Sequence, residues 1–277
     1  MTNNNIAIII LNYNSWQDTI KEADLCNSKL RIDYKDIIII DNASPNDSQE
    51  MLEKEAEKKN FVFIKASHNH GYASGNNIGM KYAYNHGYKY AWILNNDIEI
   101  DDVKIVSKLM NIFIKDKKIA IINPDIYSPN GYMYNRDAKK PSFYDFTIGA
   151  FNYKKKGRKI NDLGDYAYIY RPQGCCMMVD LKKMKEIDFM DEHTFLYVEE
   201  PILAERLLSK GYRCACCLNT KIVHNHSTTV KSVFAKNKIR KIYRESFSYY
   251  LKEYRKFNFV KIAICCFFND IKLMITE

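Results

Sequence analysis

Residues 6–14 have the sequence IAIIILNYN, an unbroken apolar run that ends in polar residues. A continuous run of β-branched residues is typical of a strand buried on both faces of a parallel sheet. Similar runs occupy residues 37–40, 61–64, 90–94 and 119–122, and apolar residues at helical spacing lie between them. This alternation of strands and helices predicts an α/β fold with a mostly parallel central sheet.

The composition limits the function classes that fit this fold. The chain has 277 residues, 47% of them hydrophobic, which excludes a disordered protein or a disulfide-rich miniprotein. The formal net charge is +9, and residues 231–277 alone contain eleven Lys or Arg residues against four acidic ones. The body is therefore nearly neutral, which disfavours a nucleic-acid partner. The tail instead suits an anionic membrane.

Two interpretations of the tail remain open on sequence. Residues 239–257 carry apolar and aromatic side chains at helical spacing, and residues 262–268 form an apolar run. A basic amphipathic helix of this kind can lie in a membrane interface. It can equally pack on the main domain or form a homodimer, with its lysines solvated.

The cysteines and apolar runs bear on the location of the protein. Eight cysteines without a regular framework predict buried, reduced thiols in a cytosolic protein. Cys214, Cys216 and Cys217 with His224 and His226 suggest a zinc site, but their spacing lacks a C-x-x-C pair and disfavours it. We see neither a signal peptide nor an apolar run of membrane-spanning length. We expect a cytoplasmic protein, peripheral at the inner face of the cell membrane.

Polar residues follow each of the first four predicted strands. In open α/β sheets, ligands bind beyond the carboxyl ends of the strands, so this arrangement predicts a nucleotide pocket. The glycines at positions 71, 75 and 79 match neither the G-x-G-x-x-G fingerprint nor a P-loop. The candidate pocket residues are Asn12, Asn14, Asp41, Asn69, Gly71, Asn76, Asn77, Asn95, Asn96 and Asp97.

This ordered set resembles glycosyltransferase family 2, the inverting nucleotide-sugar enzymes of the GT-A fold. It is most similar to the rhamnosyltransferase-like branch that builds bacterial surface polysaccharides. The resemblance implies a GT-A domain over residues 1–230 and a basic helical extension over residues 231–277. The matching segments, in family order, are residues 11–14, 41–44, 69–79, 94–97, 174, 191–192, 195–200, 211 and 224.

The resemblance also implies roles in donor binding. Asp41 would accept hydrogen bonds from the base or ribose, and Asn76 or Asn77 would line the same nucleotide pocket. Asp97 stands where the family's Asp-x-Asp motif ends, and Asn95 replaces the first carboxylate of that motif. Asp97 would hold Mg²⁺ or Mn²⁺ on the donor diphosphate, leaving the metal one anionic ligand fewer.

His224 occupies the position of a late metal ligand or diphosphate contact in GT-A enzymes. The alternative is an ordinary histidine at the end of a strand.

The acidic pair Glu199-Glu200 matches the family's carboxylates before a helix. Inversion needs a base that takes the proton of the acceptor hydroxyl, and we assign Glu200 to this role, with Glu199 as runner-up. The alternative is that the pair has no catalytic role and occurs because the dipole of a helix favours acidic residues at its N-terminus. Ile202 stands where many relatives carry a further aspartate.

The expected function is transfer of a sugar from a UDP- or dTDP-sugar to a glycan, most simply a lipid-linked one. The pathway would be synthesis of capsule, O-antigen or another surface polysaccharide, with the irregular residues 127–170 on the acceptor side. A sugar nucleotidyltransferase is disfavoured because residues 12–15 lack a basic, glycine-rich loop. A catalytically inactive glycan-binding or scaffold subunit is disfavoured by the intact Asp97, Glu199 and Glu200.

Overall fold

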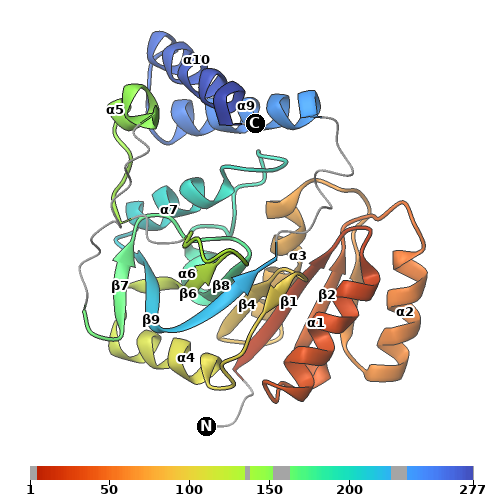
Figure 1. Ribbon diagram of the computed structural model, residues 1–277. Coiled ribbons are helices and arrows are strands. Elements are labelled where there is room, and N and C mark those ends of the chain that lie inside the picture. The colour runs from red at the N-terminus through yellow and green to blue at the C-terminus, as the bar shows by residue number, and fades with distance from the viewer. Residues whose placement is uncertain (1–4, 135–137, 152–162, 226–235, 277) are drawn as a thin grey trace.

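The computed structural model describes residues 5–134, 138–151, 163–225 and 236–276, which form one mixed sheet between helices (Figure 1). The strands are β1 (Ile6–Asn12), β2 (Ile37–Asp41), β3 (Val62–Lys65), β4 (Tyr90–Leu94), β5 (Ile98–Glu99), β6 (Ile119–Tyr127), β7 (Tyr166–Ile169), β8 (Cys176–Asp180) and β9 (Arg213–His224). The α-helices are α1 (Trp16–Ser28), α2 (Ser48–Lys59), α3 (Tyr72–Asn85), α4 (Ile105–Lys115), α5 (Phe143–Phe146), α6 (Leu181–Glu186), α7 (Glu199–Ser209), α9 (Lys236–Glu253) and α10 (Phe259–Thr276). Two 3₁₀ turns span Tyr34–Asp36 and Ile148–Phe151.

The sheet confirms the predicted α/β architecture. Its order is β3-β2-β1-β4-β8-β6-β9-β5, and β7 pairs with β9 beside this path. The strands β3, β2, β1 and β4 are mutually parallel, so their carboxyl ends meet at one edge. β8 runs antiparallel to both β4 and β6 and brings the segment before it to that same edge.

The core lies on both faces of the sheet because successive side chains of a strand point to opposite sides. Ile8 and Ile10 pack with residues of α1, α2 and α4 on one face. Ile9 packs with residues of α3, α6 and α7 on the other. All eight cysteines are unpaired and seven are buried, as the composition predicted.

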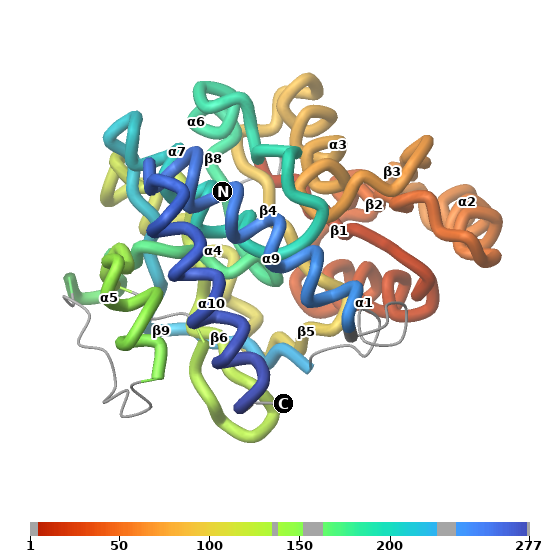
Figure 2. Tube along the Cα trace, turned by 90° about the horizontal axis from the view of Figure 1, so that it is seen from above, coloured from red at the N-terminus to blue at the C-terminus, as the bar shows by residue number. Residues whose placement is uncertain are grey.

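The last two described helices differ in how they are covered. Phe247, Tyr250 and Leu251 of α9 are buried in a cluster with Ile202 of α7 and with Cys265 of α10. For α9 the structure therefore favours packing on the main domain over membrane contact. α10 lies outside α9, as both views of the molecule show (Figures 1 and 2). No helix in the described ranges is long and apolar enough to span a membrane.

Candidate active site

The neighbouring ends of β1 and β2 form the floor of the predicted nucleotide pocket. Asn12 stands opposite Asp41 in the parallel register, and its Nδ2 donates to Asp41 Oδ2 at 2.7 Å. Asp41 is fully buried, and its carboxylate also accepts from the backbone and hydroxyl of Ser44 and from Gln49 Nε2 at 3.0 Å. The chain's own donors thus occupy the Asp41 carboxylate, and its predicted contact with the base or ribose stays a prediction.

Two asparagine side chains beside this floor carry unsatisfied oxygens. Asn14 Oδ1 and Asn76 Oδ1 are buried and have no hydrogen-bond partner among the described residues. Asn76 Nδ2 donates to the Tyr72 carbonyl at 3.0 Å, and this bond orients the amide. Because buried polar atoms rarely stay unpaired, these oxygens are suited to accept from a bound ligand.

The turn into α3 depends on Gly71. Asn69 Oδ1 accepts from the Gly71 amide at 2.9 Å and closes the turn. Gly71 has φ of 97°, and a β-carbon there would lie 1.9 Å from the carbonyl oxygen of Phe195. That same oxygen accepts from the Tyr72 amide at 3.0 Å, so glycine allows the segment before α7 to lie directly against α3.

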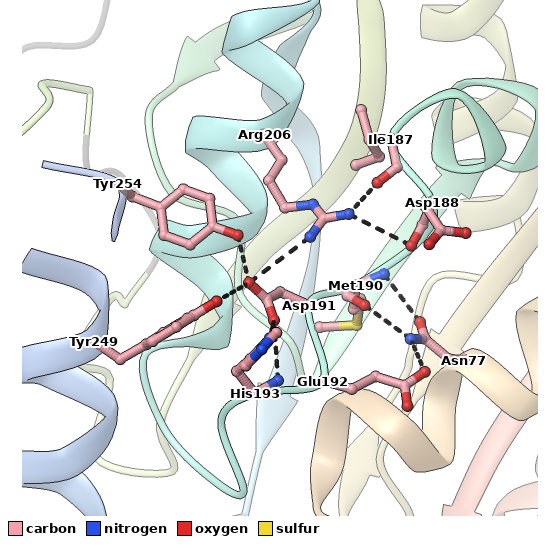
Figure 3. Close-up of polar contacts among 10 residues, drawn as sticks. All are labelled: Asn77, Ile187, Asp188, Met190, Asp191, Glu192, His193, Arg206, Tyr249 and Tyr254. Atoms are coloured by element: carbon pink, nitrogen blue, oxygen red, sulfur yellow. Dashed lines mark hydrogen bonds and ion pairs between the residues drawn. The ribbon is translucent and has the colours of Figure 1, made fainter. Parts of the chain in front are cut away.

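Asn77 holds the segment before α7 through its side chain (Figure 3). Its Nδ2 donates to the Met190 carbonyl at 2.8 Å and to Glu192 Oε1 at 2.7 Å, and its Oδ1 accepts from the Met190 amide at 3.0 Å. The amide is therefore occupied by this segment, a role that the sequence did not indicate. Its predicted nucleotide contact stays a prediction.

Asp191, in the same segment, joins it to the tail (Figure 3). The carboxylate accepts from the hydroxyls of Tyr249, at 2.8 Å, and Tyr254, both from α9 or the turn after it. It also lies 2.7 Å from His193 Nδ1. Burial raises the pKa of Asp191, but hydrogen bonds from Tyr254, His193 and Tyr249 outweigh it and bring the pKa to about 2. Asp191 thus stays ionised and fixes the segment before α7 to the tail.

The turn after β4 places Asp97 next to His224. The Asn95 amide donates to the Cys175 carbonyl at 2.8 Å, and Asn96 Nδ2 donates to Ser15 Oγ at 2.9 Å. His224 Nε2 lies 3.1 Å from Asp97 Oδ1, and both side chains are largely buried. The two residues predicted as metal ligands are therefore adjacent.

A carboxylate beside an imidazole fits a divalent cation such as Mn²⁺. No cluster of three or more His, Cys, Asp or Glu side chains suited to a metal occurs in the described part of the chain. The remaining ligands of a cation at Asp97 and His224 would come from a diphosphate and water, as is usual for Mg²⁺ and Mn²⁺. The zinc alternative with Cys214, Cys216 and Cys217 gains no support, and its remaining member, His226, lies outside the described residues.

The carboxyl groups of Glu199 and Glu200 lie in different surroundings. Glu199 Oε2 is buried without a hydrogen-bond partner among the described residues, and burial, followed by the charge of Glu200, raises the pKa of Glu199 to about 8. Glu200 Oε1 accepts from the Gly174 amide at 2.7 Å, and its Oε2 lies 3.8 Å from Arg171. Both contacts suit a carboxylate, whereas Glu199 with its raised pKa is mostly protonated at neutral pH, so Glu200 is the candidate base of the pair.

The backbone just before this pair is strained. Tyr197 and Val198 have φ of 68° and 67°, and a β-branched residue rarely adopts this left-handed conformation. Strain of this kind concentrates at functional sites.

The acidic pair and the Asp97–His224 pair border a common region at the start of β8. Desolvation raises the pKa of the Cys175 thiol, and the charges of Glu200 and Asp97 both add to this effect. Tyr72 Oη donates to the Gly174 carbonyl at 2.7 Å, next to the amide that serves Glu200. The candidate base and the predicted metal pair thus both lie near Cys175.

A cavity of about 780 Å³ opens beside Glu199 and Glu200. It is walled by the predicted acceptor-side stretch, by the start of α7 and by both tail helices. Its aromatic lining consists of Phe146, Tyr170, Tyr197, Tyr243, Phe247 and Tyr250, and its basic lining of Lys139, Lys140, Arg171 and Lys272.

The sequence profile described as glycosyl transferase family 2 matches residues 7–184, well over half of the chain. The chain belongs to glycosyltransferase family 2. As a member of this family it is a nucleotide-sugar glycosyltransferase, as the resemblance implied. The match shows the family and not its rhamnosyltransferase-like branch.

Curated relatives of this family 2 enzyme agree. A hexosyltransferase of low-salt glycan biosynthesis from Haloferax volcanii is 26% identical over 223 residues, which cover 79% of this chain and 67% of that protein. A poly-β-1,6-N-acetyl-D-glucosamine synthase from Staphylococcus aureus is 30% identical over 123 residues, or 44% of this chain and 29% of that protein. This chain thus matches only part of the length of each of these two relatives.

Solved structures share the GT-A fold. A mannosyltransferase from Pyrobaculum calidifontis, in complex with GDP-Man and Mn²⁺, superposes with a TM-score of 0.61 at 10% identity over 97% of this chain and 70% of that one. The S. aureus protein TarS in complex with UDP-GlcNAc gives a TM-score of 0.56 at 12% identity over 94% and 70% of the two chains. These neighbours bind nucleotide sugars, and the first binds Mn²⁺.

Proposed function

We propose that this enzyme transfers a sugar, with inversion, from a UDP- or dTDP-sugar to a hydroxyl group of a glycan acceptor. The contrast between Glu199 and Glu200 carries this proposal. The two residues are neighbours in the chain, yet only Glu200 accepts a hydrogen bond on one oxygen, from the Gly174 amide, and faces a cation, Arg171, with the other. An acidic pair needed only to cap α7 would not require one member to be buried without a partner.

The proposed step is a direct displacement. Glu200 accepts the proton of the acceptor hydroxyl while that oxygen bonds to the anomeric carbon from the face opposite the nucleotide. The bond between the anomeric carbon and the diphosphate oxygen breaks, and its electron pair leaves with the nucleoside diphosphate. Glu199, with its pKa near 8, is mostly protonated at neutral pH and can donate a hydrogen bond but not act as the base.

The donor would lie along the carboxyl ends of β1, β2 and β4. The open acceptors Asn14 Oδ1 and Asn76 Oδ1 suit N–H or O–H groups of the base and ribose. Asp97 and His224 would hold Mg²⁺ or Mn²⁺, which would neutralise the charge of the departing diphosphate. Asp41 supports this surface from below, while Asn69 and Gly71 shape its border.

The acceptor would occupy the aromatic cavity beside Glu200. Aromatic rings offer flat apolar faces to the C–H groups of a sugar, and the basic residues suit a phosphate in a lipid-linked glycan. The pathway in this proposal is capsule or O-antigen synthesis on a lipid-linked acceptor. The enzyme would be cytoplasmic and peripheral to the membrane. Rhamnosyl transfer is the form of the reaction that the resemblance favours.

A thermal-shift screen with UDP-, dTDP- and GDP-sugars, each with and without Mn²⁺, tests the proposal. A ligand that binds only the folded state raises the unfolding temperature by mass action. We expect selective stabilisation by one nucleotide class, enhanced by Mn²⁺, and release of its nucleoside diphosphate. Stabilisation without any release of nucleoside diphosphate would favour the inactive glycan-binding subunit.

A further inference from the structure

The outward face of α10 is apolar along the whole helix. Its inward side carries Cys265 and Cys266, which are buried against α9. On the outward side, the exposed fractions are 62% for Val260, 60% for Phe267 and 68% for Met274. In both views of the molecule α10 forms the outermost layer of its side (Figures 1 and 2).

Helical spacing places these side chains in one continuous stripe. At about 100° per residue, the positions within about 50° of the most exposed direction are apolar without exception. We call this set the α10 stripe, and it consists of Val260, Ala263, Ile264, Phe267, Ile271 and Met274. The outward face of a surface helix is ordinarily polar, so a contiguous apolar face indicates an interaction surface.

The charge balance of the tail favours an anionic partner. Residues 236–276 contain ten Lys or Arg residues against three acidic ones. Exposed cations lie along α9, in the turn after it and at the start of α10, among them Lys241, Lys252, Lys256 and Lys261. This excess of positive charge would repel a second copy docked through the same helix, and it would attract an anionic lipid surface.

The size of the stripe also opposes a homodimer. An 18-residue helix is about 27 Å long, so a stripe about 10 Å wide covers about 270 Å². A stable protein–protein interface buries about 800 Å² per partner. A lipid surface has no such requirement, because insertion of a few apolar side chains adds to the attraction of the surrounding cations.

We propose that the α10 stripe is a membrane-docking surface that inserts into the headgroup region of an anionic bilayer. The inference deepens the proposed function, since it rests on a lipid-linked acceptor. Lys272 of α10 and Tyr243 of α9 both line the cavity beside Glu200. Docking through α10 would therefore hold a helix that walls the acceptor cavity at the bilayer surface, where such an acceptor is held.

Co-sedimentation of the full chain with vesicles tests this surface. The vesicles are phosphatidylcholine alone, or phosphatidylcholine with about one third phosphatidylglycerol, at low and high salt. We expect binding only to the anionic vesicles and a decrease with salt. The variant Val260→Glu/Phe267→Glu should bind at least about tenfold more weakly, because two anchors become charged. Ile114→Glu is the matched control, as Ile114 is 51% exposed on the distant α4 and its variant should bind as the parent does.

Nucleotide-sugar stabilisation of the same variants separates this inference from the proposed function. The stripe variant should keep the parent's thermal shift with the nucleotide sugar, which also shows that it is folded. Equal vesicle binding by parent and stripe variant would overturn the inference. Absence of binding of the parent protein to anionic vesicles would also overturn it. A dimer that dissociates on Phe267→Glu would assign the stripe to a second copy instead. Vesicle binding without any nucleotide-sugar binding would leave the docking surface standing and refute the proposed function.

Discussion

His224 Nε2 lies 3.1 Å from Asp97 Oδ1, although one residue follows β4 and the other ends β9. The short strand β5 causes this contact, because it pairs antiparallel with β9 and sets Ile98 opposite His224. The aspartate in the turn after β4 thereby gains an imidazole partner from β9, the last strand along the chain. We propose that the pair would provide two of the ligands that a cation bound to the donor diphosphate needs.

The first prediction concerns this pair. Asp97→Ala should lower the affinity for the nucleotide sugar in the presence of Mn²⁺ by at least about tenfold, because Asn95 and Asn96 are neutral and cannot replace the carboxylate. His224→Ala should have a smaller effect in the same direction. Titration calorimetry with and without Mn²⁺ measures both.

Asp101→Ala is the control for that measurement. Its side chain is 99% exposed and lies on the same stretch of chain after β4. If Asp97→Ala bound the donor with the parent's affinity and the parent's dependence on Mn²⁺, the metal assignment would be wrong.

The second prediction concerns Glu22, a buried carboxyl group on α1. Its side chain is 3% exposed, and burial, followed by the charge of Asp97, raises its pKa to about 8. A raised pKa means that the folded state binds its proton more tightly than the unfolded state, so the stabilisation is complete below about pH 4.5 and is lost as the pH rises through about 8.

In Glu22→Gln the free energy of unfolding should depend less on pH, because glutamine does not titrate. The free energy of unfolding of the parent should fall between pH 5 and pH 8 by about 1–4 kcal/mol more than that of the variant, as measured by urea denaturation. Glu53→Gln, in which a half-exposed carboxylate is changed, should follow the parent. Parallel curves for parent and Glu22→Gln would show that Glu22 is ionised in the folded protein.

The third prediction concerns Asp191, whose pKa is shifted in the opposite direction, to about 2. Its stabilisation is present above about pH 4 and is lost as the pH falls toward 2. Asp191→Ala should lower the free energy of unfolding at pH 7 by about 2–4 kcal/mol, because the hydroxyls of Tyr249 and Tyr254 lose their acceptor.

A variant at the other end of the same contact serves as the comparison. Tyr249→Phe removes one hydrogen bond and leaves the carboxylate its other donors, so we expect a loss of only about 1 kcal/mol. Equal losses for the two variants in denaturant titrations would mean that Asp191 is not the centre of this network.

The sequence predicted the elements whose pattern is local. The apolar runs that begin at Ile6 and Ile37 are buried strands, because only strands covered on both faces carry such runs. The polar ends of these strands do converge, since parallel strands end at one edge. Asp97 and His224 also meet, a relationship that only the resemblance had implied.

Other features could not be predicted because they depend on tertiary contacts. Asn77 resembles any polar residue in a loop-to-helix turn, and only the fold shows its amide bound to Met190 and Glu192. Phe247 and Phe267 both belong to apolar helical patterns, yet the first is 6% exposed and the second 60%. Glu199 and Glu200 are identical residues in adjacent positions, and their surroundings alone distinguish them.

The rate of nucleoside diphosphate release tests the central claim, that Glu200 is the base of a nucleotide-sugar transferase, most directly. With the donor found by thermal shift, Glu200→Gln should lower this rate by about a hundredfold or more and leave donor affinity unchanged, because glutamine keeps the shape but cannot take a proton. Glu199→Gln, which replaces a mostly protonated acid, should change the rate by less than about tenfold at pH 7. A large loss in Glu199→Gln together with a normal rate in Glu200→Gln would contradict the account and move the base to Glu199.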